Sequence, residues 1–282
     1  MLTKPFFIGA IVVSLLMART AQCSFTTFSV GGDTTTASIQ PTVDSFRAAL
    51  GNPNNANAAG PLASGRREIN WDGGGATTAA SAPATFAGFQ NTRGALFTTP
   101  GTGFLQTPLT DPALTSINAT YATTFGTFSP QRFFTAVGSG ITDVTFSIPG
   151  TGGTVPATVH GFGAVFSDVD VANVSLLQFF DEHGTQIFIQ SPSAGTVDNA
   201  SLSFLGAIAN AGEEIFRVRI TTGSAALGPN DDPSLGVDMV VLDDFIYAEP
   251  SALPEIGSTV LYLSLGFAGL TLLRSQLQAS KE

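Results

Sequence analysis

The chain of 282 residues is poor in charge: Asp, Glu, Lys and Arg make up 11% of it, against about 25% in an ordinary soluble domain. Its 31 glycines and 16 prolines exclude a helical bundle or coiled coil, and its 23 phenylalanines exclude a largely disordered chain. The net charge of -10 excludes nucleic acid as a partner, because such binding depends on lysine and arginine.

Residues 1–23 are predicted to be an export signal. Lys4 gives a positive start and an apolar, uncharged stretch follows over 6–17, so that cleavage fits after Ala21 or after Cys23. A retained membrane anchor is one alternative, although the stretch is shorter than the ~20 residues of a spanning helix, and lipidation of Cys23 is another. This is the single cysteine, so the processed domain is expected to have no disulfide and no thiolate site.

One helix is predicted near the start of the exported body, over residues 42–50. Val43, Phe46 and Leu50 share one face of it, and Gly51 ends it. The stretch 51–65 is rich in Asn, Ala, Pro and Gly, and a loop is expected there.

Strands are predicted from about residue 84 onward, with a Pro-Gly turn at 98–101. Apolar residues alternate with polar ones, or form short runs, over 86–97, 132–137, 141–148, 158–166, 174–180, 185–190, 202–208, 215–221 and 237–247. Because no helices are predicted between these strands, antiparallel pairing is expected. The fold class is therefore all-β: one antiparallel, jelly-roll-like β-sandwich over 24–249 with one short N-terminal helix, flanked by the N-terminal signal helix and a C-terminal hydrophobic helix.

Four residues before a Gly-rich stretch are candidate glycan contacts: Arg66, Asn70, Trp71 and Asp72. An exposed tryptophan beside polar groups offers a face on which a sugar ring can stack. Two alternatives stay open, because a lone tryptophan is often part of the core and because Arg, Glu and Asp here can form a structural network that pins the preceding loop.

Two aspartate pairs are candidate metal ligands. Asp168 and Asp170 follow one apolar run, and Asp243 and Asp244 lie on the last strand. If these strands are neighbours, the four carboxylates repel one another unless a cation or protons intervene, and Ca²⁺ takes about six to eight oxygen ligands. A structural calcium site is expected here, with solvated aspartates as the alternative. The pair at 231–232 is a further possible contributor, although a solvated turn explains it equally.

No catalytic residue is predicted. His160 and His183 are the two histidines and stand alone in sequence, and Glu213 and Glu214 fit a turn. Metalloprotease, nucleophile-elbow and P-loop motifs are absent from the sequence. The chain is expected not to be an enzyme.

The C-terminus has three parts: a linker and short motif over 250–259, an apolar run over 260–273, and Arg274 followed by a polar tail. This order is typical of a signal that holds a chain in a membrane through a hydrophobic helix, here 260–282, with its basic end inside. The motif consists of Leu253, Pro254, Glu255, Ile256, Gly257, Ser258 and Thr259.

This C-terminal segment resembles the tripartite signals of PEP-CTERM proteins, especially the variant class whose motif reads Val-Pro-Asp-Ser-Gly followed by Ser-Thr. Leu253 and Glu255 depart from the commoner Val and Asp, and Arg274 stands where a basic cluster is usual. The resemblance implies an exosortase-like membrane protease as partner, which removes the tail and passes the protein to the cell surface. A C-terminal anchor that is never cut is the alternative.

The body carries a weaker resemblance. The segment 241–245 is similar to the closing strand of extracellular jelly rolls, and the blocks 65–73 and 161–170 resemble those of uncharacterised bacterial secreted proteins. We therefore expect a non-enzymatic, exported surface or extracellular-matrix protein. The alternative is a secreted carbohydrate-binding module, or less readily a glycan-active enzyme, that contacts extracellular polysaccharide through the Trp71 region.

Overall fold

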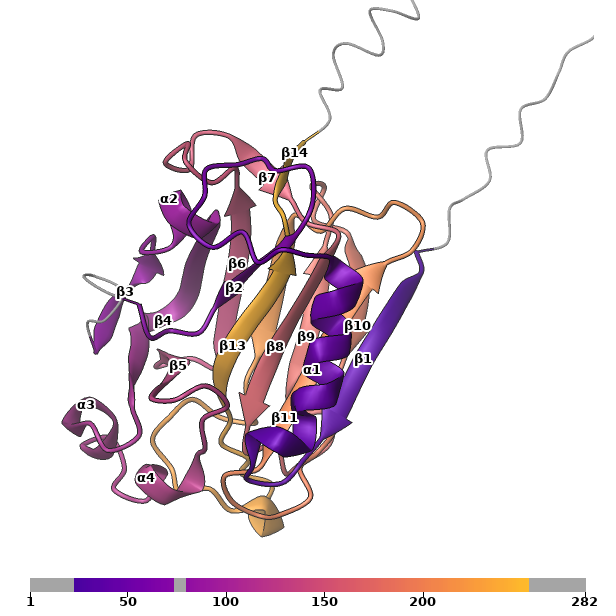
Figure 1. The fold of residues 1–282 in the computed structure, drawn as a ribbon. Helices are drawn as coiled ribbons and strands as arrows, with labels where there is room; N and C mark the ends of the chain where they lie inside the picture. Colours follow the sequence, from indigo (N-terminus) through magenta and orange to yellow (C-terminus); the bar gives the residue numbers. More distant parts are fainter. Residues whose placement is uncertain (1–22, 74–79, 254–282) are drawn as a thin grey trace, which may run out of the picture.

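The computed structural model describes residues 23–73 and 80–253 (Figure 1). The expected signal peptide, most of the sorting motif and the C-terminal hydrophobic helix lie outside these residues. Within them, the elements in chain order are β1 (Phe25–Gly31), α1 (Thr36–Leu50), β2 (Arg66–Ile69), β3 (Ser81–Phe86), α2 (Gln90–Arg93), β4 (Ala95–Pro108), α3 (Pro112–Thr115), α4 (Tyr121–Thr124), β5 (Arg132–Val137), β6 (Ile141–Ser147), β7 (Pro156–Thr158), β8 (Gly161–Ser167), β9 (Leu176–Phe180), β10 (Gln186–Gln190), β11 (Leu202–Ala209), β12 (Arg217–Thr221), η2 (Pro233–Leu235), β13 (Val241–Ala248) and β14 (Ser251–Ala252).

The strands form one large antiparallel sheet that is nearly closed as a barrel or sandwich. Its main path runs β1-β11-β8-β13-β5-β4-β6-β12-β9-β10. The two ends of this path come together, because Thr27 Oγ1 on β1 donates a hydrogen bond to Gln190 Oε1 on β10 at 3.3 Å. The mostly-β, antiparallel character expected from the sequence is confirmed.

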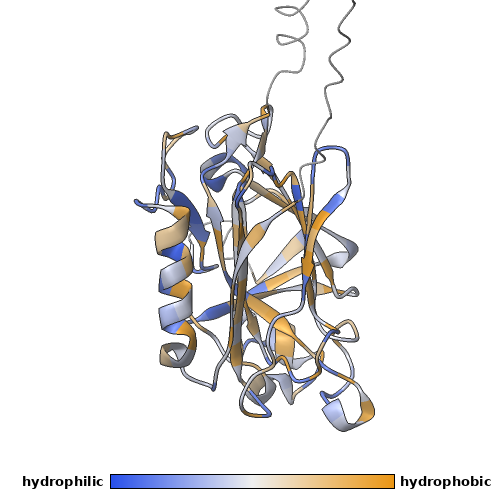
Figure 2. Cartoon of the chain, turned by 90° about the vertical axis from the view of Figure 1, so that its right-hand side faces the viewer, coloured by the Kyte–Doolittle hydropathy of each residue, from blue (hydrophilic) through white to orange (hydrophobic). Residues whose placement is uncertain are grey.

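Aromatic side chains fill the space between the two layers of strands. Phe162 on β8 lies 6.3 Å from Phe146 on β6, 6.5 Å from Phe179 on β9 and 5.4 Å from Phe245 on β13, measured between ring centroids. Such tilted and edge-on pairs add to the stabilisation that burial alone provides. The many phenylalanines therefore build the core, and Figure 2 shows that many residues of the strands are hydrophobic.

Helix α1 packs on the outer face of the layer that contains β1 and β11 (Figures 1 and 2). Its buried residues are Ile39, Val43, Phe46 and Leu50. The Phe46 ring fits over a pair of glycines, Gly163 on β8 and Gly206 on β11, which face each other in register. A Cβ atom on either glycine would lie 2.8 Å from this ring, so the glycines leave the space that the helix fills.

The helix is longer than expected, since it begins at Thr36 and carries Pro41 inside it. A proline within a helix removes one backbone hydrogen bond. Here the added turn brings Ile39 into the same buried face as Val43, and this packing offsets the loss.

The expected turn at 98–101 is wrong, because β4 runs straight through it. The segment instead marks a change of partner: residues 95–98 of β4 pair with β6, and residues 103–108 pair with β5. The sequence also failed to predict β1, β2 and β3, and the strand expected over 86–97 is wrong for most of its length, because α2 lies within it. The hairpin of β9 and β10 is confirmed.

Among the described residues, no helix combines the length and the apolar character that a membrane span requires.

Candidate metal centre

Three carboxylates come together where β8 ends. Asp168 and Asp170 follow this strand, and Asp231 reaches them from the long connection between β12 and β13. One oxygen from each residue lies within 4.8 Å of the others. A fourth carboxylate joins them, because Asp238 Oδ1 accepts a hydrogen bond from the Asp170 backbone N–H at 3.2 Å.

Buried oxygens without partners distinguish this group from a surface cluster. Asp168 and Asp238 are both 0% exposed. One oxygen on each of them, and one on Asp170, is buried without a hydrogen-bond partner among the described residues. Buried polar atoms are nearly always satisfied, and a cation or protons could satisfy these three carboxylate oxygens.

The remaining oxygens are held by the backbone. Asp168 Oδ1 accepts a hydrogen bond from the Ala200 N–H at 3.0 Å, and Asp231 Oδ1 accepts one from the Met239 N–H at 2.8 Å. These bonds fix the orientation of two carboxylates and leave their second oxygens directed elsewhere. The site is therefore built from three separate segments that the sheet brings together.

Electrostatics in the group disfavour ionised carboxylates when no cation is present. Burial, followed by the charges of Asp170 and Asp231, raises the pKa of Asp168 to about 9. Burial and the neighbouring carboxylates also raise the pKa of Asp170 to about 7, and burial raises that of Asp238 to about 6. A divalent cation would reverse this repulsion, whereas protons can neutralise it only in part at neutral pH.

The donor set suits a hard cation. Carboxylate oxygens are the ligands that Ca²⁺ prefers, and backbone carbonyls and water complete its shell of about six to eight oxygens. In the part of the chain that the structure describes, no histidine or cysteine belongs to the group, so the soft-ligand sites of zinc do not fit. Calcium is the ion that these residues fit best.

Asp243 and Asp244 are not part of this group, which corrects the expected set of four. Strands β8 and β13 are neighbours, but Ser167 pairs with Val241 and the two strands are antiparallel. Residues that follow β8 therefore lie beside residues that precede β13. Asp231 and Asp238 take the places expected for Asp243 and Asp244, and antiparallel pairing applied to the sequence would have pointed to the loop before β13.

Asp243 and Asp244 form a separate, buried carboxyl pair. A register shift between Leu242 and Phe245 lets both side chains be buried on one strand. Asp243 Oδ2 accepts hydrogen bonds from the backbone N–H groups of Phe128 (2.6 Å) and Ser129 (3.3 Å). Asp244 accepts one from the Ser129 hydroxyl at 2.5 Å and lies 3.4 Å from Arg47.

Trp71 does not offer a stacking surface, because it is 0% exposed. Its ring stacks on Phe134 with 3.8 Å between centroids, and its Nε1–H donates to the Asp243 backbone oxygen at 3.0 Å. Asp72 accepts a hydrogen bond from the Gln131 N–H at 3.0 Å, and Asn70 is exposed. The expected glycan platform on Trp71 is therefore corrected to a core position.

The alternative for this region, a network that pins the preceding loop, is confirmed. Arg66 donates to Glu68 (2.6 Å) and to Asn52 (2.6 Å). Arg67 is fully buried, pairs with Glu249 through two hydrogen bonds of 2.6 Å, and donates to the backbone oxygens of Ala56 and Ala58. Both arginines thus tie loop 51–65 to the sheet.

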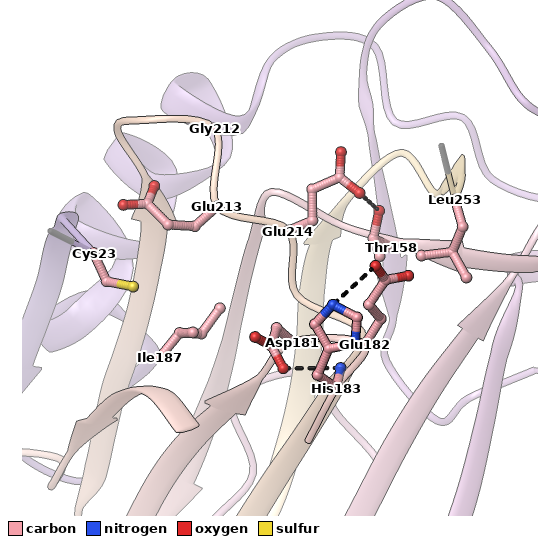
Figure 3. Close-up of a pocket in the computed structure, with 10 residues that line it drawn as sticks. All are labelled: Cys23, Thr158, Asp181, Glu182, His183, Ile187, Gly212, Glu213, Glu214 and Leu253. Atoms are coloured by element: carbon pink, nitrogen blue, oxygen red, sulfur yellow. Dashed lines mark hydrogen bonds and ion pairs between the residues drawn. The ribbon is translucent and has the colours of Figure 1, made fainter. Parts of the chain in front are cut away.

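A hollow of about 340 Å³ lies between the two described ends of the chain, and Figure 3 shows its lining. Cys23 and Leu253 both border it. Glu214 accepts a hydrogen bond from Thr158 at 2.7 Å, and His183 lies 3.5 Å from Glu182 with its side chain 71% exposed. These contacts account for the groups as parts of turns and strand ends.

Leu253 is the one residue of the expected sorting motif that the structure describes, and it is half-buried directly after β14. Pro254, Glu255, Ile256, Gly257, Ser258, Thr259 and Arg274 lie outside the described residues. No family model, curated protein or solved structure matches the chain.

Proposed function

We propose that the chain is a non-enzymatic, exported surface or extracellular-matrix module whose loops are fixed by a structural calcium ion. The observation that carries the calcium is the pair of fully buried aspartates, Asp168 and Asp238, each with an unpartnered oxygen beside Asp170 and Asp231. Calcium outside the cell is abundant enough to fill a weak site of this kind.

Export and sorting are parts of the same proposal and are supported by the two ends of the sequence. The apolar N-terminal stretch favours secretion, and the C-terminal motif, apolar run and Arg274 favour transfer to the surface by an exosortase-like protease. The jelly-roll form of the sandwich is also proposed. It is supported by the strand order, in which strands distant in sequence, such as β1, β11 and β8, are neighbours.

Thermal melting of the full chain in millimolar Ca²⁺ and in chelator, at constant ionic strength, tests the calcium. A ligand at 100 times its dissociation constant stabilises the native state by about 2.7 kcal/mol, which corresponds to a rise of about 5–10 °C in a domain of this size. Asp168→Asn and the less buried Asp231→Asn are each expected to abolish this rise.

Glu182→Gln is the matched control, because Glu182 is an exposed carboxylate on the hairpin of β9 and β10. It should keep the full calcium effect. Identical melting curves in calcium and chelator for the wild-type chain, or a rise that survives in both aspartate variants, would overturn the calcium site.

A further inference from the structure

A second hollow, of about 500 Å³, opens between α1, the end of β2 and the segment before β5. The residues that give it chemical character are Gln40, Arg47, Glu68, Asn70, Arg93 and Asp244. They come from four segments of the chain: α1, the end of β2, α2 and β13. The volume lies in the range of small-molecule sites, about 300–1,000 Å³.

The inner wall of this hollow is rigid. Arg47 donates to Glu68 Oε2 through Nε (3.1 Å) and Nη2 (2.9 Å), and it also contacts Asp244 at 3.4 Å. Asp244 is in turn held by the Ser129 hydroxyl. The side chains of Glu68 and Asp244 are 14% and 5% exposed, so they form a preorganised floor.

The rim carries freer groups. Asn70 is exposed and contacts only Asp72 within the described residues, at 3.4 Å. Arg93 donates through Nε to Asn57 at 2.7 Å and forms no ion pair with any described residue. Both side chains can therefore turn toward a ligand without breaking the fold.

The charges in the lining exclude several kinds of ligand. The lining contains two arginines and two carboxyl groups, so its positive and negative charges balance. This balance favours neither a cation nor an anion as the ligand. A fully apolar ligand would leave these polar groups without partners, which is costly. A ligand with adjacent hydroxyl groups both donates and accepts hydrogen bonds. The amide, guanidinium and carboxylate groups of the lining supply the matching acceptors and donors.

We propose that this hollow binds a neutral, hydroxyl-rich ligand, namely a sugar unit of a polysaccharide. Hydroxyl groups would bond to Asn70, Arg93 and the accessible edge of the Glu68 carboxylate, and the exposed Pro130 would contact the C–H face of the ring. The inference goes beyond the proposed calcium-bound module and assigns polysaccharide recognition to a place other than Trp71. It does not depend on the metal.

Binding of the full chain to an immobilised panel of neutral, sulfated and uronic-acid oligosaccharides tests the site. We expect saturable binding to neutral members, and an affinity about tenfold weaker in Asn70→Ala and in Arg93→Gln. Gln186→Ala is the control, because this exposed amide lies on β10 and its side chain contacts only Gln178 among the described residues. It should bind as the wild type does.

Melting curves must show that both rim variants remain folded. Repeating the panel in chelator, at a temperature at which the chain without calcium remains folded, separates this site from the proposed calcium site. The sugar should bind equally well with and without calcium. Absence of binding to every neutral oligosaccharide, or binding that is unchanged in both rim variants, would overturn the proposal while leaving the calcium test unaffected.

Discussion

Trp71 illustrates how one residue organises the core of this protein. It contacts four rings, stacking on Phe134 and meeting Phe89, Phe97 and Phe245 edge-on. Trp71→Ala is expected to lower the free energy of unfolding by about 3–5 kcal/mol through the cavity that it leaves. Trp71→Phe should cost less, since it keeps an aromatic ring but loses the hydrogen bond to the Asp243 carbonyl. Urea denaturation measures both.

A role in sugar binding predicts a different pattern for the same variants. If Trp71 were a surface platform, Trp71→Ala would lose ligand affinity while its unfolding curve stayed that of the wild type. Its complete burial argues for the opposite result.

The buried pair Asp243–Asp244 makes stability depend on pH. Burial, followed by the charge of Asp244, raises the pKa of Asp243 well above its usual value, and burial raises that of Asp244 to about 6. The native state therefore binds more protons than the unfolded chain above about pH 4. The stability that these protons provide is complete below that pH and is lost as the pH rises through about 6.

Asp243→Asn tests this dependence. The amide mimics a protonated Asp243, because it can donate a hydrogen bond and cannot ionise. In chelator, the free energy of unfolding of the wild type should fall between pH 5 and pH 8, and the variant should fall less steeply. Urea denaturation at the two pH values gives both slopes. Equal slopes in the two proteins would show that Asp243 does not retain its proton.

The aspartates also show the limit of what residue types alone can predict. The sequence identified Asp168 and Asp170, because aspartates after an apolar run indicate a strand end. It could not identify their partners, since these depend on strand direction and on the bulge that buries Asp243 and Asp244. Burial of Trp71 likewise depends on rings contributed by β4, β5 and β13.

At the scale of elements, alternation and short apolar runs predicted most strands of the second half of the chain, whether one face is buried, as in β12, or both, as in β11. β5, β6, β9, β10, β11 and β12 all lie within or close to the predicted ranges. β1 was missed because its burial pattern does not alternate cleanly, and β2 because it is four residues long and rich in charge. The first turn of α1 was missed because Pro41 has a low helix propensity, which tertiary packing overrides here.

The docking of α1 depends on the glycine pair under Phe46. Gly206→Ala places a methyl group against a ring that is itself fully buried, and we expect it to lower the free energy of unfolding by about 1–3 kcal/mol. This loss should exceed the small gain from reducing the freedom of the unfolded chain. Urea denaturation measures the net effect.

A double-mutant cycle with Phe46→Leu assigns the effect to this contact. The smaller side chain leaves room for the new methyl group, so Gly206→Ala should cost less in the Phe46→Leu background, with a coupling of about 1 kcal/mol. If the losses in free energy of unfolding of the two single variants simply add, the effect of Gly206→Ala comes from the strand and not from its contact with Phe46.

At the scale of the whole molecule, the described chain ends and the candidate metal centre lie at opposite ends of β8. Thr158, shortly before β8, lines the hollow that Cys23 and Leu253 also border, whereas Asp168 follows the other end of the strand. β1 begins and β14 ends at the same end of the molecule, and η2 lies at the opposite end (Figure 1). A chain held through either terminus would therefore present the end that carries the proposed calcium site away from the point of attachment.

Processing at the C-terminus is the prediction that belongs to this scale. The proposed sorting motif begins at Leu253, directly after β14, so a protease that recognises it would not need to open the sheet. We expect the mature surface protein to lack the residues beyond about Gly257, with the apolar run removed together with Arg274. Intact-mass measurement of the protein recovered from the cell surface checks this directly. Recovery of a chain that still carries Lys281 and Glu282 would mean that the segment serves as an uncut anchor, because cleavage at the motif releases both residues with the tail.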